Sequence, residues 1–317
     1  MSEDPDTDKS LGGNLWRFRP VDERQTELIS QRYNLPYLVA QIISSRGIPV
    51  DGVPSFIDPK LQNLMPDPYC LKDMKTAAQR LAKAISSSEK IGIIGDYDVD
   101  GATSTSVLRK FLEFNGIKPS VHIPEREEGY GPSRQAFDEF KAQGISLVVT
   151  VDCGTTAFDV FDYAASEGFE VIVLDHHEAE VMLPKVYAVV NPKRLDEQND
   201  YDYLKYMAAV GVVFMTIVAI NRELRQTGFY QTHPEPKLMD MLDLVALGTV
   251  CDVVPLLGLN RAFVRQGLKV MSLRRNIGLK ALIDSSGISE APEAYHLGYV
   301  LGPRINACGR VGEAALG

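Results

Sequence analysis

The chain has 317 residues, of which 45% are apolar and 24% are charged, and its formal net charge is −9. This length and composition are typical of a globular protein with one large domain or two. No apolar run is long enough to cross a bilayer, and the acidic first residues are unlike a secretory signal. The negative charge argues mildly against a nucleic-acid partner but does not decide the question, because carboxylates that bind metal also count as negative.

The four cysteines, Cys70, Cys153, Cys251 and Cys308, are far apart and show no C-x-x-C spacing. This pattern favours reduced thiols in a cytoplasmic protein over disulfides or a thiolate zinc site.

The first part of the chain predicts little regular structure. Residues 1–20 are expected to form a disordered leader, and residues 21–85 an extension of helices and turns. Within the extension, residues 35–47 have helical periodicity and end at a glycine, as helices often do. Residues 49–72 are rich in proline and aspartate and predict short turns, and a polar helix is expected over 74–87.

From residue 91 onwards, strand-like and helical patterns alternate, which predicts an α/β fold with a doubly wound, mostly parallel sheet. Beyond residue 191 the pattern becomes helical. Strands are expected at 91–94, 119–123, 147–151, 171–174 and 186–190; the helices between them at 102–115, 133–143 and 156–167; and the later helices at 207–226, 238–247, 260–273, 278–284 and 294–301.

Acidic side chains follow three of these strands at the point where each strand ends. Asp96 and Asp98 follow the first strand, Asp152 follows the strand at 147–151, and Asp175 follows the strand at 171–174. Parallel strands deliver such residues to one edge of the sheet, where open α/β sheets bind their ligands. Carboxylates gathered there without a cation would repel one another. The pattern therefore predicts bound divalent metal ions.

Two simpler explanations compete for the acidic loop at 95–101. A calcium-binding EF-hand would need a glutamate at its twelfth position, which is Val107 here, so calcium is disfavoured. An acidic helix cap explains one acid but not three. Asp100 is the acid that best fits a cap.

The triplet Asp175-His176-His177 adds imidazoles to the acids. Adjacent histidines project in different directions, so one can ligate metal while the other faces a substrate. Asp175 could orient the ligating ring. A further acid, Asp252, follows the helical segment at 238–247. Four aspartates and one histidine suit Mn²⁺ or Mg²⁺ better than a thiolate-type zinc site.

Five segments, in this order and spacing, resemble the motifs of the DHH phosphoesterase superfamily, and within it the family of bacterial single-strand-specific 5′→3′ DNA exonucleases. The similarity runs from about residue 35 to the end. The segments are Gly-Asp-Tyr-Asp-Val-Asp-Gly (95–101), Val-Asp-Cys-Gly (151–154), Asp-His-His (175–177), Gly-Thr-Val-Cys-Asp-Val-Val-Pro (248–255) and Gly-Pro-Arg-Ile-Asn-Ala-Cys-Gly-Arg (302–310).

The resemblance implies a role for each matching residue. Asp96 would hold one metal ion and Asp98 the other, Asp152 would bridge both, and His176 and Asp252 would complete the second site. His177 would face the scissile phosphate, supported by Asp175, so these two are the expected catalytic pair. The expected substrate-binding residues are Arg126, Arg304, Asn306 and Arg310. One departure is Ile94, which stands where some relatives have a histidine.

The resemblance also implies a function and its context. Residues 86–317 would form the DHH phosphoesterase domain, without the second lobe and the nucleic-acid-binding OB domain that this family carries. The expected activity is hydrolysis of single-stranded DNA in repair and recombination by a cytoplasmic monomer, with a single-strand-binding protein and a helicase as possible partners. The alternatives are a phosphoesterase acting on oligonucleotides, cyclic dinucleotides or pyrophosphate, and an inactive truncated fragment or scaffold.

Overall fold

The computed structural model describes residues 10, 12–15, 17, 19–125 and 128–311, the last four of these by their backbone alone. The chain forms two compact units, Met1–Pro59 and Lys60–Gly317. The expected leader lies largely outside the described residues. No helix in the described part of the chain is long and apolar enough to span a membrane.

The first unit contains three short helices, α1 (Glu23–Tyr33), α2 (Tyr37–Ser45) and α3 (Val53–Ile57). Helix α2 confirms the helix expected over 35–47. The sequence pattern did not reveal α1, because only Thr26 and Ile29 on this polar helix are buried. Its start is defined by Asp22, whose side chain accepts a hydrogen bond from the backbone N–H of Gln25.

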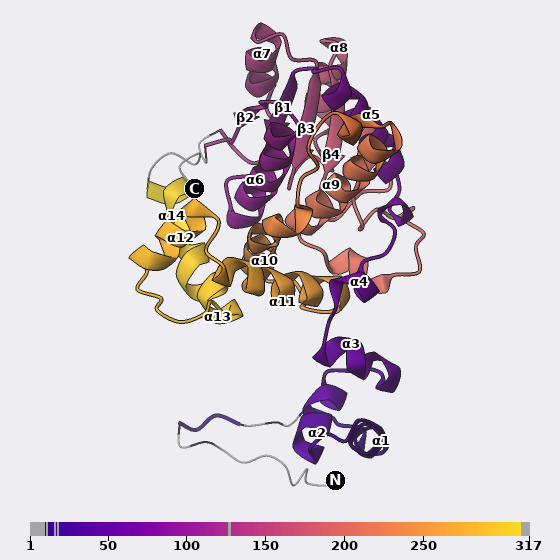
Figure 1. Cartoon of the computed structure of the whole chain (residues 1–317), viewed down its shortest axis with the longest axis vertical. Helices are drawn as coiled ribbons and strands as arrows, with labels where there is room; N and C mark the ends of the chain where they lie inside the picture. Colours follow the sequence, from indigo (N-terminus) through magenta and orange to yellow (C-terminus); the bar gives the residue numbers. More distant parts are fainter. Residues whose placement is uncertain (1–9, 11, 16, 18, 126–127, 312–317) are drawn as a thin grey trace. The chain divides into compact units, whose positions relative to one another are not determined.

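The second unit is built around a five-stranded sheet with strand order β2-β1-β3-β4-β5, in which all neighbouring strands are parallel (Figure 1). The α/β fold with a parallel sheet predicted from the sequence is therefore confirmed. The strands are β1 (Ile91–Ile94), β2 (Ser120–His122), β3 (Leu147–Val151), β4 (Glu170–Leu174) and β5 (Ala188–Val190).

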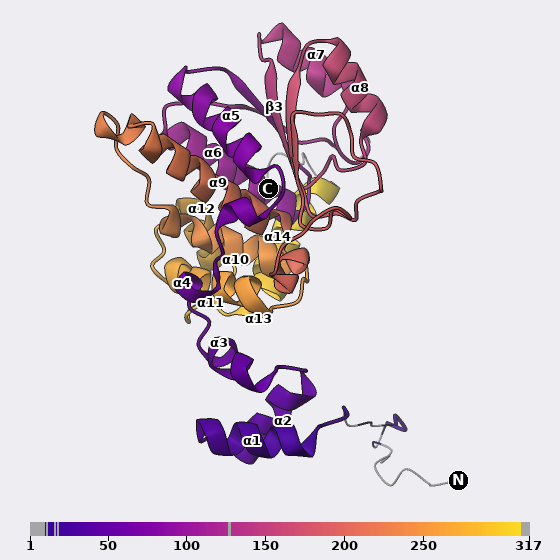
Figure 2. The same ribbon diagram turned by 90° about the vertical axis from the view of Figure 1, so that its right-hand side faces the viewer.

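Helices cover both faces of the sheet, with α5, α6 and α9 on one face and α7 and α8 on the other (Figure 2). Alternate residues of each strand enter the two cores: Ile93 and Val149 pack in the core with α5, α6 and α9, whereas Ile94 and Val148 pack with α7 and α8. These helices are α5 (Met74–Ser86), α6 (Val99–Phe114), α7 (Arg134–Ala142), α8 (Phe158–Ser166) and α9 (Ala209–Gln226).

The remaining helices lie beyond the carboxyl ends of the strands (Figure 1). Helix α10 packs along both α6 and α11, and the fifth sequence motif, 302–310, is helical. The segment expected to be one helix over 294–301 is a short α-helix followed by a π-helical turn, Leu297–Leu301. These helices are α4 (Leu61–Leu64), α10 (Leu242–Cys251), α11 (Gly258–Ser272), α12 (Ile277–Ser285), α13 (Ala294–His296) and α14 (Gly302–Val311).

Candidate metal centre

The strand order creates a break in topology between β1 and β3. The chain moves outward from β1 to β2 and then crosses back to β3 on the other side of β1. At such a switch point the loops after the two central strands diverge and leave a crevice for ligands. Asp96 and Asp98 follow β1 and Asp152 follows β3, so the sheet places all three acids at this crevice.

The predicted metal-site residues come together in three overlapping groups, within each of which the possible ligand atoms lie within 4.8 Å of one another. Asp152 and His176 each belong to two groups, which is the arrangement expected of residues shared between neighbouring ions. The groups are Asp96, Asp98 and Asp152; Asp152, His176 and His177; and Asp100, His176 and Asp252.

The loop after β1 approaches its helix very closely. Asp98 caps α6 by accepting a hydrogen bond from the backbone N–H of Gly101 at 2.9 Å. A Cβ atom at position 101 would lie only 2.5 Å from the carbonyl oxygen of Asp96. Glycine is therefore required for the helix to begin directly beneath the two acids.

His176 is held in its neutral form, as a metal ligand requires. Burial lowers its pKa to about 4, so the ring carries no charge at neutral pH. Its Nδ1 lies 3.0 Å from the carbonyl oxygen of Met207, an acceptor that selects the tautomer with the proton on Nδ1. This tautomer leaves a lone pair on Nε2, which lies close to the carboxylates of Asp152 and Asp100.

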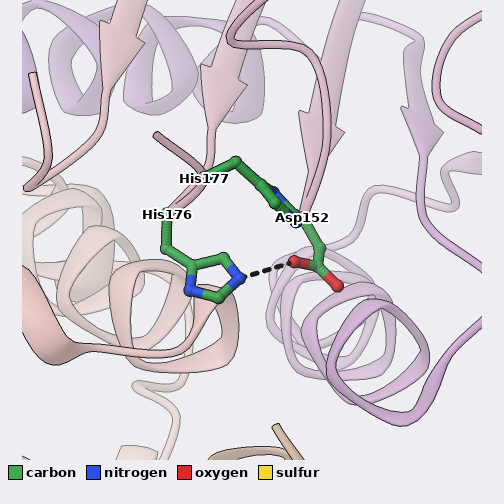
Figure 3. Close-up of side chains that lie close together, drawn as sticks. All are labelled: Asp152, His176 and His177. Carbon is green, nitrogen blue, oxygen red and sulfur yellow. Dashed lines mark ion pairs between the residues drawn. The ribbon is translucent and has the colours of Figure 1, made fainter. Parts of the chain in front are cut away.

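The contact between His176 and Asp152 has the chemistry expected of a cation site. His176 Nε2 lies 3.2 Å from Asp152 Oδ1 (Figure 3). Within the described part of the chain, this buried oxygen accepts no hydrogen bond. Two electron-rich atoms at this separation are stabilised by a metal ion ligated by both. The side chains present therefore fit a divalent ion.

Asp175 stabilises the loop that carries both histidines through hydrogen bonds to its carboxylate. Its Oδ1 accepts hydrogen bonds from the backbone N–H groups of His176 and His177 and lies 2.7 Å from His177 Nδ1. Its Oδ2 accepts two hydrogen bonds from Thr155. Burial opposes ionisation of Asp175, but the hydrogen bonds from His177 and Thr155 outweigh it and hold the pKa below its usual range. These contacts make Asp175 a positioning residue.

His177 differs from His176 in exposure and charge. Nearly half of its side chain is exposed, at 47%. The hydrogen bond to Asp175 raises the pKa of His177 above its usual value. A solvent-facing imidazole that gains positive charge is suited to contact an anionic substrate.

Asp100 has a role that the sequence indicated only in part. It caps a helix, but the helix is α9 rather than its own: its carboxylate accepts hydrogen bonds from the backbone N–H groups of Ala209 and Val210 at 2.6 and 3.0 Å. Burial and the nearby charge of Asp252 raise the pKa of Asp100. This acid therefore joins α6 to α9 next to the predicted metal ligands His176 and Asp252.

Asp100→Ala should lower the free energy of unfolding even when a chelator removes all metal. Two buried N–H groups lose their acceptor, which costs about 1–3 kcal/mol for each group. Asp100→Asn keeps one acceptor oxygen and should lose less. Urea unfolding in EDTA measures both variants. Unchanged stability of Asp100→Ala in EDTA, together with weaker Mn²⁺ binding, would show that Asp100 is a metal ligand rather than a cap.

Mn²⁺ affinity should rise between pH 5 and pH 7. Burial and the charge of Asp98 raise the pKa of Asp252 to about 6, so a proton competes with metal below that pH and the competition fades above it. Burial also raises the pKa of Asp152, which adds to this slope, whereas His176, with a pKa of about 4, does not contribute. Calorimetric titrations at several pH values measure the slope. The slope of Mn²⁺ affinity against pH should be smaller in Asp252→Asn. An affinity that does not change with pH in the unaltered protein would contradict the role of Asp252 as a metal ligand.

Tyr130 is a site residue that the sequence analysis missed. Its hydroxyl donates to the carbonyl oxygen of Asp152 at 3.0 Å and lies 3.1 Å from His177 Nδ1. It therefore contacts the backbone of the proposed bridging residue and the exposed histidine together. The signal in the sequence was the pair of flanking glycines, Gly129 and Gly131. In the structure both have positive φ, a conformation that favours glycine.

The structure brings the predicted metal ligands together, but it does not do the same for the predicted substrate-binding residues. Arg126 lies outside the described residues, as does the side chain of Arg310. Arg304 donates a hydrogen bond to the carbonyl oxygen of Val300. It also lines a cavity of about 370 Å³ between α6, α10, α12 and α14. None of the described residues that line this cavity is a predicted metal ligand. Asn306 is half-buried on α14. Their contact with substrate remains a prediction.

Together, the parallel sheet and the acid–histidine groups at its switch point define a metal-binding α/β domain. Residues 90–249, about half of the chain, match the model of the DHH family, N-terminal domain. The chain belongs to the DHH family.

Curated relatives carry the description single-stranded-DNA-specific exonuclease RecJ. The chain is 38% identical to RecJ of Bacillus subtilis over 94% of its own length and 36% of the relative's. It is 34% identical to RecJ of Escherichia coli, over 95% of the chain and 51% of the relative. The chain thus spans about half or less of the length of these relatives.

Solved structures agree with these matches. The crystal structure of RecJ in complex with Mn²⁺ from Thermus thermophilus matches 92% of the chain and 40% of that protein, with a TM-score of 0.74 and 30% identity. A second exonuclease RecJ structure, bound to manganese, matches 80% of the chain and 60% of that protein, with a TM-score of 0.67 and 34% identity.

Proposed function

We propose that this chain carries the catalytic centre of a 5′→3′ exonuclease that hydrolyses phosphodiester bonds of single-stranded DNA with two divalent ions, Mn²⁺ or Mg²⁺. The observation that carries the proposal is the sharing of Asp152 between two ligand groups, one with Asp96 and Asp98 and one with the histidines. The names of the RecJ relatives and the Mn²⁺ in the matching structures support the substrate and the metal.

The proposed roles are those that the family resemblance implies, and the groups of possible ligand atoms support them. Asp96 and Asp98 would hold one ion each, Asp152 would bridge them, and His176 and Asp252 would complete the second position. When bound, two such ions activate a water molecule and stabilise the leaving oxygen of the phosphodiester. His177 would contribute positive charge toward the phosphoryl group, with its ring oriented by Asp175.

The experiment that tests this function offers one enzyme two kinds of substrate. With Mn²⁺, residues 1–317 should shorten a long single strand from its 5′ end and leave blunt duplex intact. Faster hydrolysis of di- and trinucleotides than of the strand would instead favour a small-substrate phosphoesterase. No hydrolysis of either, with metal bound, would favour the inactive alternative. The proposal further includes a cytoplasmic monomer that works with a helicase and a single-strand-binding protein, which rests on the family resemblance alone.

Residues 1–317 should bind single-stranded DNA weakly and with a shallow dependence on salt. Phosphate contacts are expected from only a few basic residues, such as Arg126 and Arg304. The slope of log affinity against log salt concentration becomes more negative by roughly 0.7 for each phosphate contacted on a single strand. Fluorescence anisotropy from 50 to 300 mM salt would give the slope. A steep slope, equivalent to six or more contacts, would show that this chain alone encloses the strand.

A further inference from the structure

The loop after β5 is attached to the loop that carries His177. Asn191 is fully buried, and its amide donates to Thr155 Oγ1 at 2.8 Å and to the carbonyl oxygen of His177 at 2.9 Å. The same side chain accepts a hydrogen bond from the backbone N–H of Lys193 at 2.8 Å. The backbone of Lys193 is therefore fixed relative to the proposed catalytic histidine.

The ammonium group of Lys193 lies beside the loop that carries the two histidines. Its Nζ is 3.2 Å from Glu178 Oε1, and Glu178 directly follows His177 in the chain. Lys193 thus places positive charge next to the proposed catalytic histidine.

The ion pair with Glu178 can open easily. The Glu178 side chain is 86% exposed, whereas that of Lys193 is 26% exposed. Such a solvent-exposed pair contributes little net stability, so another anion can replace the carboxylate at low cost. The backbone of Lys193 is held by Asn191, whereas the Glu178 side chain is largely exposed.

The neighbouring arginine does not offer its charge in this way. Arg194 pairs with Asp73 and Asp196, and its guanidinium also donates to the carbonyl oxygen of Val189. These contacts bind it to the sheet edge and to its own loop. Of the two cations on this loop, Lys193 is the one that pairs with Glu178, the residue after His177.

We propose that Lys193 binds a phosphate oxygen of the DNA strand beside the metal centre, and that Glu178 is the counter-ion which the phosphate displaces. This inference rests on the proposed function. Apart from the two histidines and Tyr130, the site consists of carboxylates, so a phosphodiester that approaches it needs cations from the protein as well as from metal. Lysine supplies a compact point charge with several donors, which suits a single phosphate oxygen.

Opposite effects are expected from the two members of the pair. Lys193→Gln should raise KM for a single strand about tenfold, change kcat less than about twofold, and reduce the salt slope by about 0.7. Glu178→Gln should lower KM roughly two- to threefold, because the competing carboxylate is gone. Lys193→Arg should restore most of the affinity. Lys185→Gln is the matched control: it makes the same charge change beside Phe169 and Glu170, at the start of β4 and therefore at the other end of the sheet.

Strand binding measured separately from cleavage distinguishes this inference from the proposed function. Anisotropy of a 5′-labelled strand with Mn²⁺ gives affinity, and calorimetry gives Mn²⁺ binding, which should not change in Lys193→Gln. A wild-type chain that binds the strand without cutting it contradicts the proposed function alone. Equal strand affinity of wild type and Lys193→Gln, or equal losses in Lys193→Gln and Lys185→Gln, overturns the role of Lys193. A wild-type chain that fails to bind the strand overturns both.

Discussion

Asp152→Asn should reduce phosphodiester hydrolysis by about a thousandfold or more, equivalent to roughly 4 kcal/mol of activation free energy. Asp152 is the acid shared by two ligand groups, and its buried Oδ1 lies 3.2 Å from His176 Nε2. Losing its charge should weaken both metal positions at once. Hydrolysis rates with saturating Mn²⁺, together with metal titrations, measure the effect.

The asparagine variant is preferable to alanine at this position. Asp152 has φ of 62°, a left-handed conformation that aspartate and asparagine tolerate better than alanine does. Asp152→Asn should therefore keep the fold, which circular dichroism and thermal unfolding can verify. Near-normal turnover in this variant would contradict the two-metal assignment.

His176→Ala and His177→Ala should damage the protein in different ways. His176 is buried, neutral and directed at the acids, so its loss should weaken Mn²⁺ binding at least about tenfold. His177 is half exposed, and its pKa is raised by the hydrogen bond to Asp175. Its loss should leave Mn²⁺ affinity within about twofold and lower kcat by about 10²–10⁴-fold.

Calorimetry on the two histidine variants separates these roles. Because His177 also belongs to a possible ligand group with Asp152 and His176, equal loss of Mn²⁺ in both variants would show that His177 is a ligand. Asp175→Asn serves as a third variant. It should reproduce the turnover defect of His177→Ala in part, because the ring loses the carboxylate that orients and charges it.

The strands and their terminal acids were predictable because a buried parallel strand has a clear pattern. The run at 147–151 followed by Asp152 locates both the strand and the edge of the sheet at which its acid lies. Spacing could not reveal contacts between distant segments. Asp100 caps α9 from a position 109 residues earlier in the chain. Tyr130 reaches the backbone of Asp152 from a loop with no regular structure.

The polar helix α1 shows a second limit. It carries few apolar side chains, and only two of its eleven residues are buried. The cap at Asp22 is the main local signal of its start, and a single aspartate is common in turns as well. Helices with little buried surface are therefore the elements that sequence patterns identify least well.

A crystal structure of residues 1–317 grown with Mn²⁺ tests the central claim most directly, because manganese can be located by its anomalous scattering. The account predicts two peaks roughly 3.5–4 Å apart, both in contact with the carboxylate of Asp152. One ion should also contact His176 Nε2. A single ion, or two ions of which only one touches Asp152, would contradict it.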